Sequence, residues 1–411
     1  MVKPMFFGIS SDHAPLYVQL TPDVKGDPRR RPFRFEAAWL SHSSFKELLL
    51  ASWNRDTNTP AALNELRRTL RKWNKKVFGD VQQRKDKLVS DIKVIQDQLE
   101  LQQTDELLRK EEELVKEFEI VLEQEEMLWY QKSREKWIKS GDRNTSYFHT
   151  STIIRRRRNQ IEMLKDDGGR WILNAQELEK LAIDYYRRLY SMDDVDEVVA
   201  KLPGEGFVSI SQMDQMDLKR VFTGSEVEKA IRSMNKFKAP GLDGYQPVFY
   251  QQCCDVVGES VTKFVLDFFE SGNLPTTLND ALLVLIPKVG KPKKITQFRP
   301  ISLCNVLFKI ITKAMVARLQ RVMTKLIGPA QASFIPGRMS TDNIVIVQEA
   351  VHSMKRKKGE KGWMLLKLDL EKAYDRIRWD FLEDTLRVAG FSDKWVRWIL
   401  QCVSGPSMNL L

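Results

Sequence analysis

Acidic, basic and aromatic side chains gather within seven residues near the C-terminal end of the chain, in Asp369-Leu-Glu-Lys-Ala-Tyr-Asp375. Asp369 lies at the end of an apolar run, Met364 to Leu370, which is interrupted before it only by Lys367. Such a run predicts a strand that is buried on both faces. A carboxylate at its tip needs a positive partner, and a divalent cation, which prefers oxygen ligands, would supply one. Capping of the next helix is the structural alternative.

A second group of residues could bind phosphate. Residues 282–286 form an apolar run that predicts a buried strand, Lys288 follows it, and Arg299 begins the return after a basic turn. If the two strands pair as a hairpin, Lys288 and Arg299 can project toward one point. Arginine binds phosphate as a fork and lysine as a point charge, so the pair suits a triphosphate.

The motif around Asp369 has a family likeness. Leu368-Asp-Leu-Glu-Lys-Ala-Tyr-Asp375 resembles the first palm motif of reverse transcriptases, of the non-LTR retrotransposon (LINE-like) kind. Four upstream blocks extend the resemblance in the family's order: Lys238-Ala-Pro-Gly-Leu-Asp-Gly244, Ile286-Pro-Lys288, Phe298-Arg-Pro-Ile-Ser302 and Ala332-Ser-Phe-Ile-Pro-Gly-Arg338. Together they identify the chain as a member of this family. For the glycine-rich block, close approach to a phosphate backbone and a tight turn between helices stay equally open.

The resemblance implies an RNA-directed DNA polymerase that uses an RNA template, a DNA primer and deoxynucleoside triphosphates. It implies that Asp369 is catalytic and binds Mg²⁺, and that Tyr374 blocks the ribose 2′-hydroxyl. It also implies that Lys288, Arg299 and Leu370 contact the incoming nucleotide, and that Gln331 and Arg338 lie under the template–primer.

Carboxylates beyond Asp369 are needed for this chemistry. Nucleotidyl transfer requires two metal ions about 3.5–4 Å apart, and the family supplies further ligands from an aromatic-x-Asp-Asp hairpin. We expect that hairpin to follow Leu411, so that the chain is an internal segment that binds template–primer without extending it. A non-catalytic nucleic-acid-binding fragment is the second functional hypothesis. Group II intron maturases form a neighbouring family, which residues 11–13 and the long helical region disfavour.

The N-terminal residues suggest the end of another domain. Ser11-Asp12-His13 lies between two short strands expected within residues 6–20. A carboxylate beside an imidazole fixes its tautomer and raises its basicity. Asp12 and His13 resemble the final motif of the apurinic-type endonuclease that precedes the polymerase in LINE-like elements. The motif is common by itself, and a capped turn would be its structural role.

Four consecutive arginines, Arg155, Arg156, Arg157 and Arg158, follow Tyr147, Phe148 and His149 on an expected helix. This composition suits RNA phosphates and base stacking. A solvated arginine run is an equally open interpretation.

The family resemblance, together with the periodicity of the apolar residues, implies four regions. Residues 1–25 are the expected endonuclease remnant, and residues 26–140 contain a linker and a helical hairpin that turns near Thr104. A solvated spacer is favoured for that hairpin over a nucleic-acid or dimer surface. Residues 141–224 form a basic N-terminal extension, and residues 225–411 form the fingers and partial palm. The expected fold is α+β, a long helical region followed by part of a right-hand polymerase.

Composition agrees with a polyanionic partner. Of the 411 residues, 42% are hydrophobic and 29% charged, so a packed core is feasible. The net charge is +11 and the isoelectric point about 9.3, which favours nucleic acid. The four cysteines lack metal-ligand spacing, and no run predicts a membrane span. These features predict a soluble protein of the nucleus and cytoplasm, whose oligomeric state stays open.

Overall fold

The computed structural model of the protein describes residues 2–4, 16–18, 32–133, 145–191, 202, 208–359, 361–370 and 372–410. The chain divides into two units after Phe33. In the first unit, β1 (Val2–Pro4) pairs antiparallel with β2 (Leu16–Val18). Two short strands are therefore present; the second lies within the predicted range of residues 6–20, and the first lies before it. Asp12 and His13 lie outside the described residues.

The second unit is rich in helices. Its first part contains η2 (Ala37–Ser41), α1 (Phe45–Ser52), α2 (Thr59–Trp73), η3 (Asn74–Phe78), α3 (Val81–Leu101) and α4 (Asp105–Ser133). Its middle part contains α5 (Thr145–Asn159), β3 (Leu164–Lys165), β4 (Trp171–Ile172), α6 (Ala175–Tyr190), α7 (Gln212–Lys219), α8 (Gly224–Arg232), α9 (Pro247–Gln252) and α10 (Cys254–Ser271).

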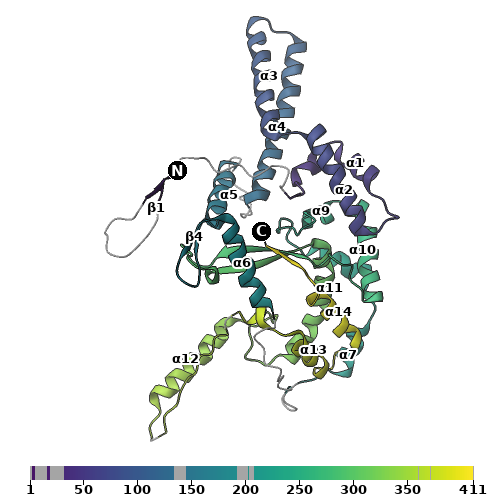
Figure 1. Cartoon of the computed structure of the whole chain (residues 1–411). Coiled ribbons are helices and arrows are strands. Elements are labelled where there is room, and N and C mark those ends of the chain that lie inside the picture. Colours follow the sequence, from purple (N-terminus) through teal and green to yellow (C-terminus); the bar gives the residue numbers. More distant parts are fainter. Residues whose placement is uncertain are drawn as a thin grey trace. The chain divides into compact units, whose positions relative to one another are not determined.

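The rest of the second unit contains the larger sheet and the C-terminal helices (Figure 1). Its elements are β5 (Ala281–Pro287), η4 (Ile295–Gln297), β6 (Phe298–Cys304), α11 (Val306–Leu326), α12 (Ser340–Arg356), η5 (Ala373–Arg376), α13 (Trp379–Val388), α14 (Asp393–Val403) and β7 (Met408–Leu410).

An aromatic core joins the first helices to α9. Phe35 is fully buried, and its ring lies 5.3 Å from that of Trp39 and 5.2 Å from that of Phe249. The Tyr245 hydroxyl donates to the Leu63 carbonyl at 2.9 Å. Such rings bury large apolar areas and make edge-to-face contacts. Residues 35–78 are therefore packed on the second half of the chain rather than forming a separate linker.

The predicted helical hairpin is confirmed. Helices α3 and α4 pack along each other, and the Thr104 hydroxyl accepts a hydrogen bond from Leu107 N at the start of α4. Leu88 and Ile95 are buried along the seam, as the period of the apolar residues predicts. Charged pairs flank it, among them Lys85 and Glu125 with 2.8 Å between Nζ and Oε2.

A buried ion pair holds α8 against α11. The Arg318 guanidinium contacts both carboxylate oxygens of Glu226, at 2.7 and 2.9 Å, and lies over the Phe222 ring. Thr223 caps α8 and forms a capping box with Glu226. Ser225 and Glu228 also match the spacing of a capping box, but the box in the structure uses Thr223 and Glu226. These hydrogen bonds lower the pKa of Glu226 to about 2.

The larger sheet has the strand order β6-β5-β7. Strands β5 and β6 form the predicted antiparallel hairpin, with Ile286 opposite Arg299, and β7 runs parallel to β5. One face of this sheet is buried, because Leu283, Leu285 and Phe298 share a core with Tyr186 of α6. Helix α6 has Asn174 as its N-cap, and the Asn174 side chain accepts from the backbone amides of Gln176 and Glu177.

Candidate nucleotide and nucleic-acid site

The β5–β6 hairpin sets Lys288 and Arg299 on the same face of the sheet. Arg299 lies opposite Ile286, and Lys288 comes two residues after Ile286. Side chains two residues apart in a strand point to the same side. Both cations are exposed, whereas Leu285 and Phe298 on the opposite face are buried. The two charges can therefore meet one anionic ligand from the open side of the hairpin.

Local contacts make the turn of this hairpin well defined. The Gln297 side chain accepts hydrogen bonds from Lys293 N at 2.6 Å and Lys294 N at 3.2 Å, and Lys288 N donates to Gln297 O at 2.8 Å. Ile295 is buried under the turn. Because these contacts pin both ends of the turn, Lys288 and Arg299 are carried on an ordered support.

The apolar run before Asp369 is not a buried strand. Residues 361–370 form no helix or strand, and all of them are exposed, including Met364 at 87% and Leu368 at 79%. The prediction of a strand buried on both faces is therefore wrong for this structure. The physical reason is the absence of a partner: among the described residues, no strand pairs with this run, and an isolated strand leaves its backbone groups unpaired.

Asp369 is an exposed carboxylate on that segment. Within the described part of the chain, the structure records no contact between Asp369 and either Lys288 or Arg299, and no group of three or more His, Cys, Asp or Glu that could hold a metal. The carboxylate oxygen is a suitable donor for Mg²⁺. One such donor does not complete the six-coordinate shell of this ion, so the described residues do not fit a two-metal site by themselves.

The turn after Asp369 is docked on α6. The Tyr190 hydroxyl donates to Asp375 Oδ1 at 3.3 Å, and Lys372 Nζ lies 4.4 Å from the centre of the Tyr185 ring. Burial, with the Asp375 charge adding to it, raises the pKa of Tyr190 to about 12. Lys372 has a φ of 53°, a left-handed conformation that costs a non-glycine residue energy. The contacts to α6 hold this strained residue in place.

Tyr374, in the same turn, has Phe334 as its neighbour. Its side chain is 73% exposed, and its ring meets the Phe334 ring edge-on with 6.0 Å between centroids. Phe334 is 81% exposed and has a φ of 65°. An exposed aromatic residue with strained backbone is a feature of binding sites. Sequence reasoning missed Phe334, although it lies within the block Ala332–Arg338; its aromatic type was the available signal.

Arg338 organises the loop that carries Phe334. Its guanidinium donates to four backbone carbonyls, those of Thr324, Ile327, Gly328 and Gln331, at 2.6 to 3.1 Å. Two of these carbonyls, those of Thr324 and Ile327, lie at the C-terminal end of α11. A cationic side chain stabilises such a helix end. Arg338 thus lies beside Gln331, and its guanidinium is used by backbone carbonyls.

The four arginines occupy the last turns of α5. Arg156, Arg157 and Arg158 are exposed, whereas Arg155 is half-buried and its Nη2 lacks a hydrogen-bond partner in the described structure. Phe148 is 1% exposed and packs on the Tyr130 ring, so it is not accessible to a base. The expectation of base stacking therefore does not hold for Phe148, although Tyr147 is half-exposed.

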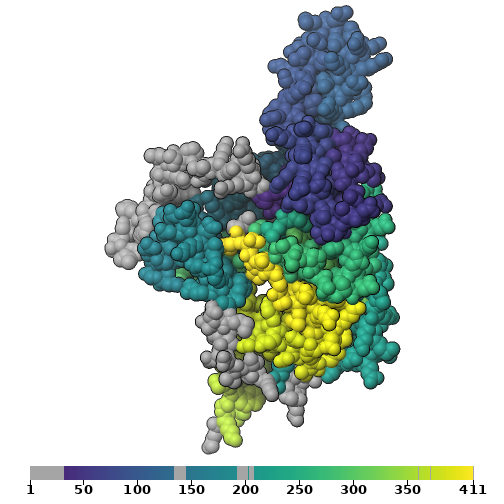
Figure 2. All heavy atoms as spheres, turned by 45° about the vertical axis from the view of Figure 1, so that its right-hand side comes forward, coloured from purple at the N-terminus to yellow at the C-terminus, as the bar shows by residue number. Residues whose placement is uncertain are grey.

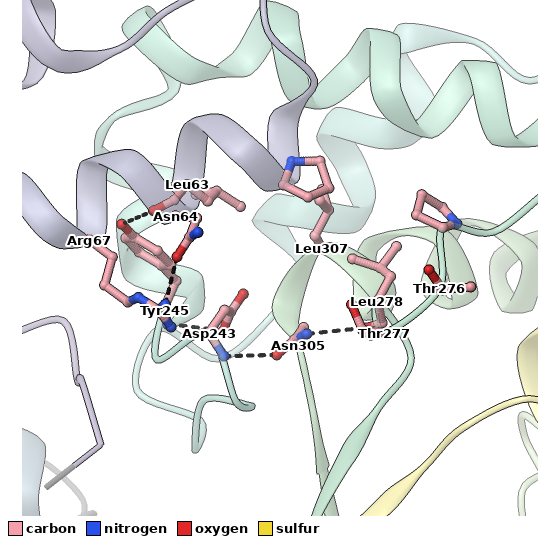
Figure 3. A pocket seen from close by; sticks show the side chains of 12 residues that line it. Leu63, Asn64, Arg67, Asp243, Tyr245, Thr276, Thr277, Leu278, Asn305 and Leu307 are labelled. Carbon is pink, nitrogen blue, oxygen red and sulfur yellow. Dashed lines mark hydrogen bonds between the residues drawn. The ribbon is translucent and has the colours of Figure 1, made fainter. Parts of the chain in front are cut away.

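The glycine-rich block lines a pocket of about 160 Å³ with residues of α2, the loop before β5 and the start of α11 (Figure 3). A side chain at Gly241 would collide with the backbone of Asn305. The Asn305 amide accepts from Asp243 N at 3.1 Å and donates to Leu278 O. Gly241 is thus needed for packing against protein, which supports the tight-turn interpretation. Burial raises the pKa of Asp243 to about 6.

A larger cleft of about 740 Å³ lies between α6, the residues around η5 and residues 403–408. Figure 2 shows the surface hollowed between α6, in teal, and the C-terminal residues, in yellow. Its lining combines basic and aromatic side chains, Arg188, Lys372, Arg376, Tyr185 and Trp379 among them. The cleft adjoins the docked turn, and Lys372, three residues after Asp369, is part of its lining.

No helix in the described ranges is long and apolar enough to cross a membrane.

Comparison with known proteins finds a family match for the C-terminal part of the chain. Residues 286–410 match the family described as reverse transcriptase (RNA-dependent DNA polymerase). The chain is 29% identical over 272 residues to the Transposon TX1 uncharacterized 149 kDa protein of Xenopus laevis, covering 66% of this chain and 20% of that protein. It is 28% identical over 203 residues to the Retrovirus-related Pol polyprotein from type-2 retrotransposable element R2DM of Drosophila melanogaster, covering 49% of this chain and 18% of that protein. The chain thus spans about a fifth of the length of these curated relatives.

Proposed function

Because this chain belongs to the reverse transcriptase family, in its non-LTR retrotransposon branch, we propose that it serves RNA-directed DNA synthesis by a LINE-like mobile element. The partners would be an RNA template, a DNA primer and deoxynucleoside triphosphates. The observation that carries the proposal is the ordered hairpin with Lys288 and Arg299 on its open face, inside the matched region 286–410.

The two hairpin cations are the proposed triphosphate ligands. Arg299 offers a planar fork to two phosphate oxygens, and Lys288 offers a point charge to a third. Ordered cations stabilise the charge that develops on the phosphates without reorganising during the reaction. Both are exposed on a rigid support, which is what a ligand arriving from solvent requires.

Asp369 is the proposed catalytic carboxylate and the first ligand of a divalent ion, with Mg²⁺ as the expected ion. In this family a divalent ion supplies the electrostatic stabilisation of the transferred phosphoryl group. Since the described residues do not complete the ion's coordination, the proposal assigns this chain one ligand only. Leu370 and Tyr374 are the proposed contacts to the nucleotide, with Tyr374 against the ribose.

Template contacts are proposed for the exposed arginines of α5. Each of Arg156, Arg157 and Arg158 that neutralises a phosphate adds about 0.7–0.9 to the log–log salt slope of binding. Half-buried Arg155 is the weakest of the four candidates. Gln331 would lie under the template–primer, while Arg338 shapes its loop. The nucleus and cytoplasm are the proposed compartments, and Asp12 and His13 the proposed endonuclease remnant.

A primer-extension assay with residues 1–411 on a primed RNA template tests this proposal, in Mg²⁺ and then in Mn²⁺. Product that requires the RNA template and is lost in Asp369→Asn would support polymerase activity. Product that persists in Asp369→Asn would remove the catalytic role of this carboxylate.

The second candidate function is nucleic-acid binding without catalysis. It is favoured by the exposed segment 361–370, which carries Asp369, and by the described residues, which contain no group of three or more His, Cys, Asp or Glu that could hold a metal. Binding of primed template with no product in either metal would select this function for the chain.

A further inference from the structure

The cleft beside the docked turn has a lining that none of the motifs above explains. It is bounded by α6 on one side, by residues 372–379 on another and by residues 403–408 on a third. At about 740 Å³ it is within the size range of ligand sites. Its polar groups come from segments that are distant in the sequence, so only the folded chain assembles it.

Two of its cations are available to a ligand. Arg376 is exposed and forms no ion pair in the described structure. Arg188 has Asp167 at 3.9 Å, with both side chains mostly exposed, and such a pair contributes little. Lys372 lies over the Tyr185 ring, and Arg378 is bound to Asp380 through two hydrogen bonds, so we count neither.

Aromatic groups lie among these cations. Trp379 is 43% exposed, and it begins α13 at the edge of the cleft. The Tyr185 hydroxyl is buried and lacks a hydrogen-bond partner within the described residues, which is costly unless a ligand or water satisfies it. The Asp375 carboxylate accepts a hydrogen bond from the Tyr190 hydroxyl. Part of the acidic charge in the cleft therefore already has a partner.

Cations interspersed with accessible aromatic rings are the chemistry of single-strand recognition, in which the backbone meets positive charge and bases stack on rings. A duplex keeps its base faces stacked on one another, so it could not use Trp379 in this way. An apolar ligand would leave the cations desolvated without partners. We propose that the cleft formed by Arg188, Arg376 and Trp379 binds one single-stranded segment of nucleic acid. This inference rests on the proposed function for the class of ligand, because an enzyme that copies a template must hold it unpaired.

The test measures binding of fluorescein-labelled oligo(U) and oligo(dT) of about 12 nucleotides, a length within the usual site size, by anisotropy across a salt series. Arg188→Gln should lower the log–log salt slope by about 0.7, the value for one phosphate contact on a single strand. Arg376→Gln should do the same. Arg187→Gln is the matched control, since Arg187 lies next to Arg188 on α6, pairs with Asp184 and does not line the cleft.

Removal of the Trp379 ring should weaken the affinity for a single strand and leave the log–log salt slope unchanged. Trp379→Leu should weaken single-strand binding by about fivefold or more, with little effect on a blunt duplex of the same length. Equal effects of Arg188→Gln and Arg187→Gln, or an unchanged affinity in folded Trp379→Leu, would overturn the proposal. Thermal melting establishes that each variant is folded.

Photocrosslinking of 4-thiouridine oligonucleotide to the unmodified chain gives a readout that needs no variant. Crosslinked peptides should contain Tyr185 or Trp379, and crosslinks confined to α5 would overturn the proposal. These outcomes are independent of primer extension. A chain that binds through the cleft but makes no product refutes the polymerase proposal alone, and a chain that makes product without cleft binding refutes this inference alone.

Discussion

Two apolar runs of similar composition adopt different structures in this protein. Residues 281–287 form β5, which pairs along its length with β6 and at one end with β7. Residues 363–370 are as rich in leucine, yet they are exposed and form no strand. Apolar content alone therefore does not make a buried strand. The difference lies in the partners that each run finds.

Pairing of β5 with β6 costs little conformational entropy. Strand β6 follows it after a short, hydrogen-bonded turn, and closing a short loop costs little. The side chains of Leu283 and Leu285 then pack on Ala182 and Tyr186 of α6. In contrast, residues 363–370 have neither a paired strand nor a covering helix in the described structure.

Truncation of one leucine in each run gives the largest expected effect. Leu285→Ala should lower the free energy of unfolding by about 2–5 kcal/mol, because it leaves a cavity in the core. Leu366→Ala should change it by about 0.5 kcal/mol or less, as for other exposed residues. Urea denaturation of both variants measures the difference.

Hydrogen exchange provides the control for this comparison. Backbone amides within β5 should exchange slowly because they are hydrogen-bonded, and those of residues 363–370 should exchange at nearly unprotected rates. Protection of the second run equal to that of β5 would mean that it is paired in solution, contrary to the structure.

The same contrast between partnered and unpartnered groups can be tested with carboxylates. Glu226 is bound by Arg318, whereas Asp369 has no ion pair in the part of the chain that is described. Glu226→Gln should lower the free energy of unfolding by about 1–3 kcal/mol, since it removes hydrogen bonds between charged groups. Asp369→Asn should leave stability unchanged.

The pH dependence of this effect has a definite sign. The pKa of Glu226 is lowered in the folded protein to about 2 from an ordinary value of 4.5. Its stabilising contribution is therefore complete above about pH 4.5, and it is lost as the pH falls toward about 2. Urea titrations at stepwise lower pH should show this loss in the native sequence but not in Glu226→Gln.

The ordered hairpin should bind triphosphate without help from the exposed run. Lys288→Gln and Arg299→Gln should each weaken metal-free binding of a deoxynucleoside triphosphate by about tenfold, the effect of one charge-assisted hydrogen bond. Lys291→Gln, at the tip of the same turn, is the matched control. Equal losses of affinity in all three variants would indicate a general electrostatic attraction instead of a specific site. Asp369→Asn should not alter metal-free binding.

The smallest effects are expected at the turn that follows the exposed run. In a primer-extension or nucleotide-binding assay, Tyr374→Ala should reduce the preference for deoxynucleotides over ribonucleotides. Phe334→Ala should reduce it by about twofold, because an exposed ring contact contributes little. Phe334→Leu should behave like the native sequence. An unchanged preference in Tyr374→Ala would remove its role in sugar selection.

Local signals in the sequence determined many of the elements. The β5–β6 hairpin follows from two apolar runs around a basic turn. The seam between α3 and α4 likewise follows from the spacing of Leu88 and Ile95. Each of these depends on interactions between residues that are close in the chain, which a sequence displays directly.

Tertiary contacts decided what the site residues are used for. Arg338 has the type of a nucleic-acid contact, but it binds four backbone carbonyls between the end of α11 and its own loop. Phe148 has the type of a stacking residue, but it is buried. The cleft between α6 and Trp379 joins residues nearly two hundred positions apart. A side chain's type sets which partners it can bind, whereas burial and the competition among nearby groups in the folded chain set which partner it has.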